Sequence, residues 1–279
     1  MWDAYDATEV VELPGGLVLD DNHRLERAEL RPLTGREEMW LTHYAGAPAA
    51  PLVTRLLSSC LVQIGDMPAS RPLTQRLLVG DRDFLVLQLR RITLGAQVSA
   101  VVVCPACGKN MDMDFSILDV PVDHRPQTAT TYRLMVEQSA GPARTVQFRL
   151  PTGADQEAVL GLAVEVAVET LLDRCLVDTA GESLSPEQRS AVIEAMDALA
   201  PQLDLEFDLS CPECSHAFLT PFDMTAFFLQ EMRANSTQLL REIHYLALYY
   251  HWSEAEILGL TRSRRRRYLA LLNEATQHE

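Results

Sequence analysis

The sequence lacks the marks of most catalytic and membrane-bound proteins. It contains no phosphate-binding glycine loop, no Gly-x-Ser-x-Gly elbow and no His-Glu-x-x-His pair. No stretch approaches the roughly 18 uninterrupted apolar residues of a membrane-spanning helix, and the first residues lack the basic start and apolar run of a signal peptide. We therefore expect a protein that is not an enzyme, has no small-molecule substrate, does not bind membranes and folds in a reducing cytoplasm.

Basic residues are also scarce. The 24 Lys+Arg stand against 39 Asp+Glu, which gives a formal net charge of −15. A chain of this charge repels itself and has no general attraction for nucleic acid or anionic membrane, so nucleic acid is not expected as a partner. The 279 residues, 47% of them hydrophobic, suffice for one large domain or two smaller ones and exclude wholesale disorder.

Six cysteines are present. In a reducing compartment such residues are metal ligands or core residues more often than disulfides. Cys60 and Cys175 each lie in an apolar helical stripe, which predicts buried, inert thiols. The other four form two Cys-Pro-x-Cys pairs, Cys104 with Cys107 and Cys211 with Cys214.

Each pair follows a predicted strand and precedes another, with mostly apolar residues at alternate positions after it. A strand–turn–strand knuckle points two thiolates at one ion, and two facing knuckles complete a tetrahedron of sulfurs. We therefore predict one structural Zn²⁺ per chain, bound by Cys104, Cys107, Cys211 and Cys214 in a split zinc ribbon. The alternatives are two unrelated pairs, a redox pair, which should instead open a helix, and a catalytic zinc, which needs an open coordination position.

The wider pattern predicts an α+β fold in three parts. Residues 1–33 are interpreted as an N-terminal extended arm of strand character, 34–235 as the zinc-ribbon core, and 236–279 as a helical C-terminal region that binds partners. The core carries an α/β insertion at about 125–200, which contains a hairpin that turns around residues 139–142.

Apolar periodicity places the helices. Helices are predicted over about 50–64 and over most of 72–94, with a break near Gly80 and an end at Gly95. In the insertion a helix is predicted with a core-facing stripe that consists of Val164, Val168, Leu171, Leu172 and Cys175.

Two features near the C-terminus suggest a surface that binds a partner. Tyr245, Tyr249 and Trp252 form a second stripe beside the core stripe of their helix, and aromatic residues are enriched at interfaces. Four consecutive arginines follow, and they would attract an acidic protein partner. The competing interpretations are that the aromatic residues pack within the chain, and that the arginines are a solvated face or contact nucleic acid. The run is Arg264, Arg265, Arg266 and Arg267.

Together these segments resemble a known family. VGDRDFLVLQLRRITLG, CPACG, CPEC and LLREIHYLALYYHWSEAEILGLTRSRRRRYLALL are similar to segments of T-even-type phage baseplate hub assembly proteins. The closer similarity is to the versions encoded beside phage tails and contractile injection systems. The resemblance covers about 34–120 and 200–275.

The resemblance implies a non-enzymatic structural or assembly protein of a phage-tail-like baseplate. Its partners would be baseplate or tail proteins. It would act in the bacterial cytoplasm during assembly and could become part of the particle. The first alternative is a zinc-ribbon protein that binds nucleic acid or acts as a transcription adaptor, and the second is a zinc-dependent hydrolase.

Overall fold

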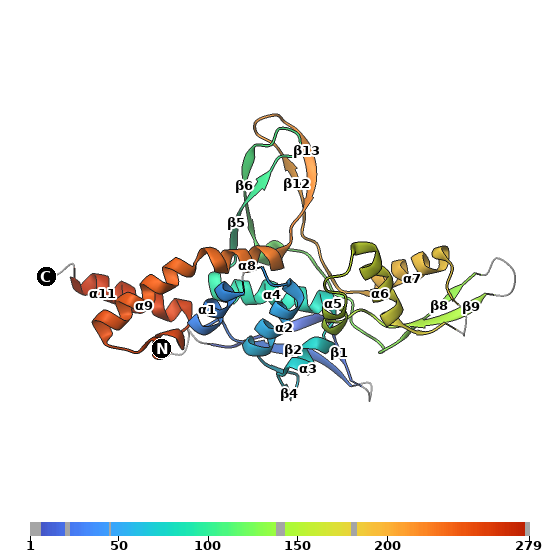
Figure 1. Cartoon of the computed structure of the whole chain (residues 1–279), viewed down its shortest axis with the longest axis horizontal. Helices are drawn as coiled ribbons and strands as arrows, with labels where there is room; N and C mark the ends of the chain where they lie inside the picture. Colours follow the sequence, from blue (N-terminus) through green and yellow to red (C-terminus); the bar gives the residue numbers. More distant parts are fainter. Residues whose placement is uncertain (1–6, 20–22, 45, 138–142, 180–182, 277–279) are drawn as a thin grey trace.

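The computed structural model describes residues 7–19, 23–44, 46–137, 143–179 and 183–276. The fold is a mixed α+β one, and the strand pairs of the described part are antiparallel. Figure 1 shows an elongated body with the C-terminal helices at one end, the insertion at the other, and two long hairpins that rise from the middle. The start of the predicted arm and the predicted turn at 139–142 lie outside the described residues.

The central sheet lies under the main core. Its strand order is β1-β2-β3-β4, and the strands are β1 Glu9–Val18, β2 Arg24–Leu30, β3 Leu61–Ile64 and β4 Met67–Pro68. The register of β1 against β2 shifts at the Pro-Gly-Gly segment, where Gly16 takes a φ of 75°, a backbone conformation that favours glycine. The part of the predicted extended arm that forms β1 and β2 is thus paired in the central sheet and packs on the core. The reason is that the apolar side chains of β1 and β2 are covered by helices from later in the chain.

Those helices are α2 (Ala49–Cys60) and α4 (Val79–Leu94), and the short α3 (Arg71–Arg76) directly precedes α4. The predicted helix over 50–64 ends early, because Leu61–Ile64 joins the sheet as β3. Gly95 ends α4 as predicted, with a φ of 100°.

Gly80 lies inside α4, and the predicted break near it occurs two residues earlier. A Cβ at Gly80 would lie 1.9 Å from the carbonyl oxygen of Pro201, so only glycine allows the chain after the insertion to pass this close. The next residue, Asp81, accepts a hydrogen bond of 2.7 Å from the backbone N–H of Gly15. This short segment therefore fastens two distant parts of the chain to the core.

The insertion has its own smaller apolar cluster. A three-stranded sheet of order β10-β9-β8 is covered by two helices. The elements are β8 Tyr132–Val136, β9 Arg144–Phe148, α5 Gly153–Ala158, α6 Val164–Cys175, β10 Leu176–Asp178 and α7 Pro186–Leu199.

The predicted core-facing stripe of α6 is only half right. Leu172 and Cys175 are buried, but Val164 is 74% exposed and Val168 is 47% exposed. The periodicity gave the correct face of the helix. What it could not show is that α7 and the sheet cover only the C-terminal turns of that face.

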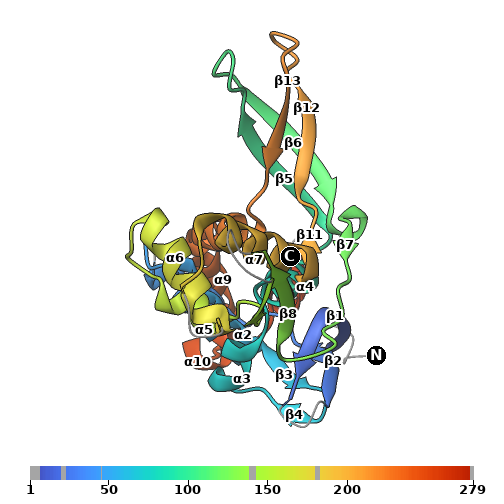
Figure 2. The ribbon, with the colours of Figure 1, turned by 90° about the vertical axis from the view of Figure 1, so that its right-hand side faces the viewer.

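The two long hairpins, here called the double hairpin, are β5–β6 and β12–β13 (Figure 2). A short strand pair, β7 with β11, and the 3₁₀ turn η2 lie near the base of the double hairpin. Apolar side chains from the base of both hairpins share a core with α8. Phe115 of one hairpin contacts Phe207 and Phe222 of the other at ring-centroid distances of 4.8 and 5.3 Å. The elements are β5 Gln97–Val103, β6 Asn110–Ser116, η2 Ile117–Asp119, β7 Val122–Asp123, β11 Gln202–Leu203, β12 Glu206–Ser210, β13 Ala217–Pro221 and α8 Met224–Ala234.

Three helices complete the chain: α9 (Ser236–Tyr250), α10 (Glu254–Leu258) and α11 (Arg262–Thr276). They pack on α1 (Gly35–His43), near the end of the body opposite the insertion (Figure 1). Reciprocal side-chain and backbone hydrogen bonds cap α1 at Thr34 and α10 at Ser253. None of the helices in the described part reaches the length and apolar character needed to cross a bilayer.

Candidate metal centre and C-terminal surface

The two cysteine pairs lie at the connections of the double hairpin, and the two connections have the same backbone geometry. In the first, the N–H of Gly108 donates to the carbonyl of Cys104 at 2.9 Å, and Gly108 has a φ of 70°. In the second, the N–H of Ser215 donates to the carbonyl of Cys211 at 2.8 Å, and Ser215 has a φ of 60°. Each first cysteine also donates its N–H to the carbonyl five residues on, at 2.9 Å. These are the two strand–knuckle–strand units that the sequence predicts.

The four sulfurs converge. The sulfurs of Cys104, Cys107, Cys211 and Cys214 all lie within 4.8 Å of one another. The Sγ atoms of Cys104 and Cys214 are 3.8 Å apart, and those of Cys107 and Cys211 are 3.7 Å apart. A tetrahedral ion with metal–sulfur bonds of about 2.3 Å requires sulfur–sulfur edges of roughly 3.8 Å. The cluster therefore has the dimensions to hold a metal ion.

Electrostatics also favours a cation among the sulfurs. Desolvation raises the pKa of the Cys104 thiol, but the N–H groups of Cys107 and Ala106 and the neighbouring sulfurs lower it to about 7. At Cys214 the N–H of His216 lowers the pKa, but desolvation and the three other sulfurs raise it to about 12. The pKa shifts of Cys104 and Cys214 are therefore opposite, because the sulfurs share hydrogen bonds within the cluster. Four thiolates at this spacing need a bound cation.

The cluster offers no open coordination position from the protein side, since four sulfurs complete a tetrahedral shell. His216, the neighbouring imidazole, is not among the converging ligand atoms of the described residues. Its ring stacks on Phe218 instead, with an interplanar angle of 13°. The two remaining cysteines are buried, as the sequence predicts, and burial raises the pKa of Cys175 to about 11.

The predicted aromatic stripe of α9 divides into an exposed and a packed part. Tyr245 and Tyr249 are 48% and 49% exposed, and Leu240 and Leu248 are more than half exposed beside them. These four side chains are here called the C-terminal surface. Trp252 does not belong to it, because its ring stacks on Tyr250 and meets Tyr268 edge-on, with centroids 5.0 and 4.8 Å apart. The competing interpretation therefore holds for Trp252, which joins α9 to α11 within the chain.

The arginine run likewise does not form one patch. Arg265 is 0% exposed, and it donates hydrogen bonds to Glu242 at 2.8 Å and to Glu38 at 2.7 Å. This corrects the prediction that Arg265 takes part in a docking surface. Arg266 and Arg267 are exposed, whereas Arg264 is half-buried and already has an interaction within the chain. The physical reason is the helical period: α11 turns every third or fourth residue inward, and α1 and α9 present carboxylates to that inner face.

Sequence reasoning did not identify these buried carboxylates. Glu242 lies three residues after Leu239 and four before Leu246, both buried, so its place on the core face of α9 was readable from the spacing. Glu38 gave no such signal, because its partner is more than two hundred residues away. The exposed apolar turns of α6 were also missed.

The family model described as "T4 bacteriophage base plate protein" matches residues 18–229, a range that contains both cysteine pairs and ends before α9. No curated protein and no solved structure matches the chain. Because the matched range spans well over half of the sequence, the chain belongs to the T4 bacteriophage base plate protein family.

Proposed function

We propose that this protein is a non-enzymatic structural or assembly component of a phage-tail-like baseplate, in a contractile tail or injection system, and that one structural Zn²⁺ stabilises it. The observation that carries the proposal is the family match over residues 18–229, which includes the four converging cysteines. Membership supports baseplate or tail proteins as the partners.

The zinc would join two segments that are distant in the sequence. Cys104 and Cys107 belong to one hairpin and Cys211 and Cys214 to the other, with the whole insertion between them in the chain. Near the base the hairpins are joined by the aromatic contacts of Phe115, but near the cysteines the shared apolar cluster is small. A structural zinc contributes on the order of 10 kcal/mol in small zinc-binding peptides. The ion would therefore fix the far ends of the hairpins against each other.

The partner-binding element is proposed at the C-terminal surface. Leu240, Tyr245, Leu248 and Tyr249 expose apolar area on the solvent-facing half of α9. Arg266 and Arg267 are exposed on α11, which packs against α9. Tyrosine and arginine are the residue types that dominate binding energy at interfaces. The basic residues would speed the approach of an acidic partner, and the apolar face would hold it.

The test uses the bacterium that encodes the particle. The gene is deleted and replaced by the wild type, by Cys104→Ser or by Cys60→Ala, and sheathed particles are counted by electron microscopy. We expect no particles without the gene, few with Cys104→Ser, and normal numbers with Cys60→Ala, whose sulfur is not among the four that converge. Normal particle numbers after deletion would overturn the baseplate role, whatever the zinc content.

Two further measurements separate the parts of the proposal. Mass spectrometry of purified particles decides whether the protein stays in the finished particle or acts only in the bacterial cytoplasm. Duplex DNA binding at physiological salt tests the adaptor alternative. We expect at most weak binding that salt abolishes, because the net charge of −15 opposes approach to the phosphates. Submicromolar binding would favour the adaptor instead.

A further inference from the structure

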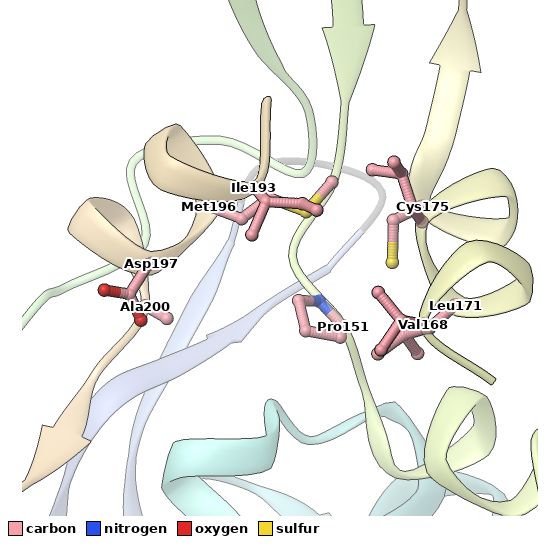
Figure 3. Close-up of a pocket in the computed structure, with 9 residues that line it drawn as sticks. Pro151, Val168, Leu171, Cys175, Ile193, Met196, Asp197 and Ala200 are labelled. Atoms are coloured by element: carbon pink, nitrogen blue, oxygen red, sulfur yellow. The ribbon is translucent and has the colours of Figure 1, made fainter. Parts of the chain in front are cut away.

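The insertion carries an apolar groove between α6 and α7, at the opposite end of the body from the C-terminal surface (Figure 1). Its volume is about 220 Å³. Figure 3 shows Val168 and Leu171 of α6 facing Ile193 and Met196 of α7, with Pro151 between them. An apolar cavity of about 150 Å³ accommodates benzene, so the groove has room for one large apolar side chain of a ligand.

The apolar surface extends beyond the groove. Val164 lies one turn before Val168 on the same face of α6, and it is 74% exposed. Leu160 and Leu162, just before the helix, are 38% and 43% exposed. Val164, Val168 and Leu171 follow the i, i+4, i+7 spacing of a helix face. An exposed apolar row that leads into an apolar groove is typical of a site that receives the apolar face of another helix.

The charges around the groove restrict the partner. Glu165, Glu169 and Asp173 follow each other at four-residue spacing on α6, beside the apolar row, and Glu194 and Asp197 are exposed on α7. Arg189 of α7 pairs with both Glu169 and Asp173. Arg174, also on α6, is held by Asp155 on the other side. The rim therefore keeps an excess of negative charge.

We infer that the α6–α7 groove binds an amphipathic helix of a partner protein, with leucine-like residues on its apolar face and Lys or Arg on its flanks. The apolar residues of that helix enter the groove next to Val168 and Ile193. Its basic residues lie against the acidic rim, which would repel an acidic helix. The site is distinct from the metal centre and from the C-terminal surface, so its occupancy and particle assembly can be measured separately.

The experiment uses the full-length protein and a fluorescein-labelled helical peptide made of leucine and lysine. The leucines are spaced i, i+4, i+7 and the lysines lie on both flanks, and a matched peptide carries glutamate at every lysine position. Anisotropy titrations compare the wild type with the pair Val164→Ser/Val168→Ser. The control pair is Val101→Ser/Val103→Ser on the double hairpin, where the two valines are 62% and 58% exposed. Both pairs exchange exposed valines for serines and leave the net charge unchanged.

We expect the lysine peptide to bind the wild type and the control pair equally, and to bind the groove pair at least about tenfold more weakly, which corresponds to roughly 1.4 kcal/mol. The glutamate peptide should bind none of them. Equal binding to all three proteins would show that the charge alone attracts the peptide, and absence of binding to the wild type would also overturn the inference.

A synthetic peptide of residues 262–276 tests whether a second copy of this chain is the occupant instead. If that peptide binds more tightly than the leucine–lysine peptide, and if the protein self-associates unless Val164 and Val168 are replaced, then the groove is an interface between copies and the inference of a separate partner is wrong.

Discussion

The buried arginine of α11 gives the sharpest test of how the C-terminal helices are held. Replacing Arg265 with methionine keeps most of the side-chain volume but removes the charge that lies between two carboxylates. The side chains of Arg265, Glu38 and Glu242 are 0%, 5% and 2% exposed. Neither carboxylate can turn to water without moving its helix. Removing one member of a buried ion pair costs about 3–5 kcal/mol, because the charge left behind is uncompensated.

The carbonyl of Leu260 adds to this cost, because it accepts a hydrogen bond of 2.9 Å from Arg265 and would lose it. We therefore expect Arg265→Met to lower the free energy of unfolding of the α1–α9–α11 unit by about 3–5 kcal/mol. Arg267→Met is the matched control. Its side chain is exposed, and surface substitutions of this kind stay within about 0.5 kcal/mol.

Hydrogen exchange followed by mass spectrometry measures this effect locally, which suits a chain with several apolar clusters. Amides of α9 and α11 should exchange faster in Arg265→Met, whereas amides of the double hairpin should not change. Adding Glu242→Met to Arg265→Met should recover part of the loss, because an apolar pair is tolerated where a lone charge is not. Equal exchange rates in Arg265→Met and Arg267→Met would refute the reasoning.

Three further predictions concern the metal, the acid response and the C-terminal surface. Elemental analysis of wild-type protein purified without chelator should give one zinc per chain, and Cys104→Ser should contain far less. Cys60→Ala should retain the zinc and lose only core-packing energy of about 1–3 kcal/mol. Wild-type protein without zinc would contradict the proposal. At Asp155 burial raises the pKa, but hydrogen bonds from Arg149 and from the N–H and hydroxyl of Thr152 lower it to about 2 from its ordinary value of 3.8. The stability that this carboxylate gives is therefore present above 3.8 and is lost as the pH falls toward 2. Protection of the α5 amides relative to their intrinsic exchange rates should fall over that window, and unchanged protection would contradict the assignment. Tyr249→Ser should reduce particle assembly while leaving the melting temperature almost unchanged, since this side chain is 49% exposed; a large drop in melting temperature would mean that Tyr249 packs within the chain.

The sequence by itself determined the features that depend on near neighbours. The knuckles need only Cys-Pro-x-Cys between two strands, because their hydrogen bonds join residues four or five positions apart. The caps at Thr34 and Ser253 are likewise set by a glutamate three residues on. The convergence of the two cysteine pairs was also predictable, because each pair supplies only two of the four ligands that a tetrahedral ion requires.

Only the tertiary structure decided which residues of each apolar or basic helical stripe are buried by other elements. Arg265 and Arg266 are adjacent and chemically identical, but one faces Glu38 from the start of the chain and the other faces solvent. Val164 and Cys175 share one stripe of α6, but only the second has the β-sheet and α7 over it. Burial is set by elements that are distant in the sequence, and periodicity carries no information about where those elements end. For that reason the convergence of the four cysteines was predictable from the residues, whereas the exposed parts of the C-terminal surface and of the α6–α7 groove could be defined only from the fold.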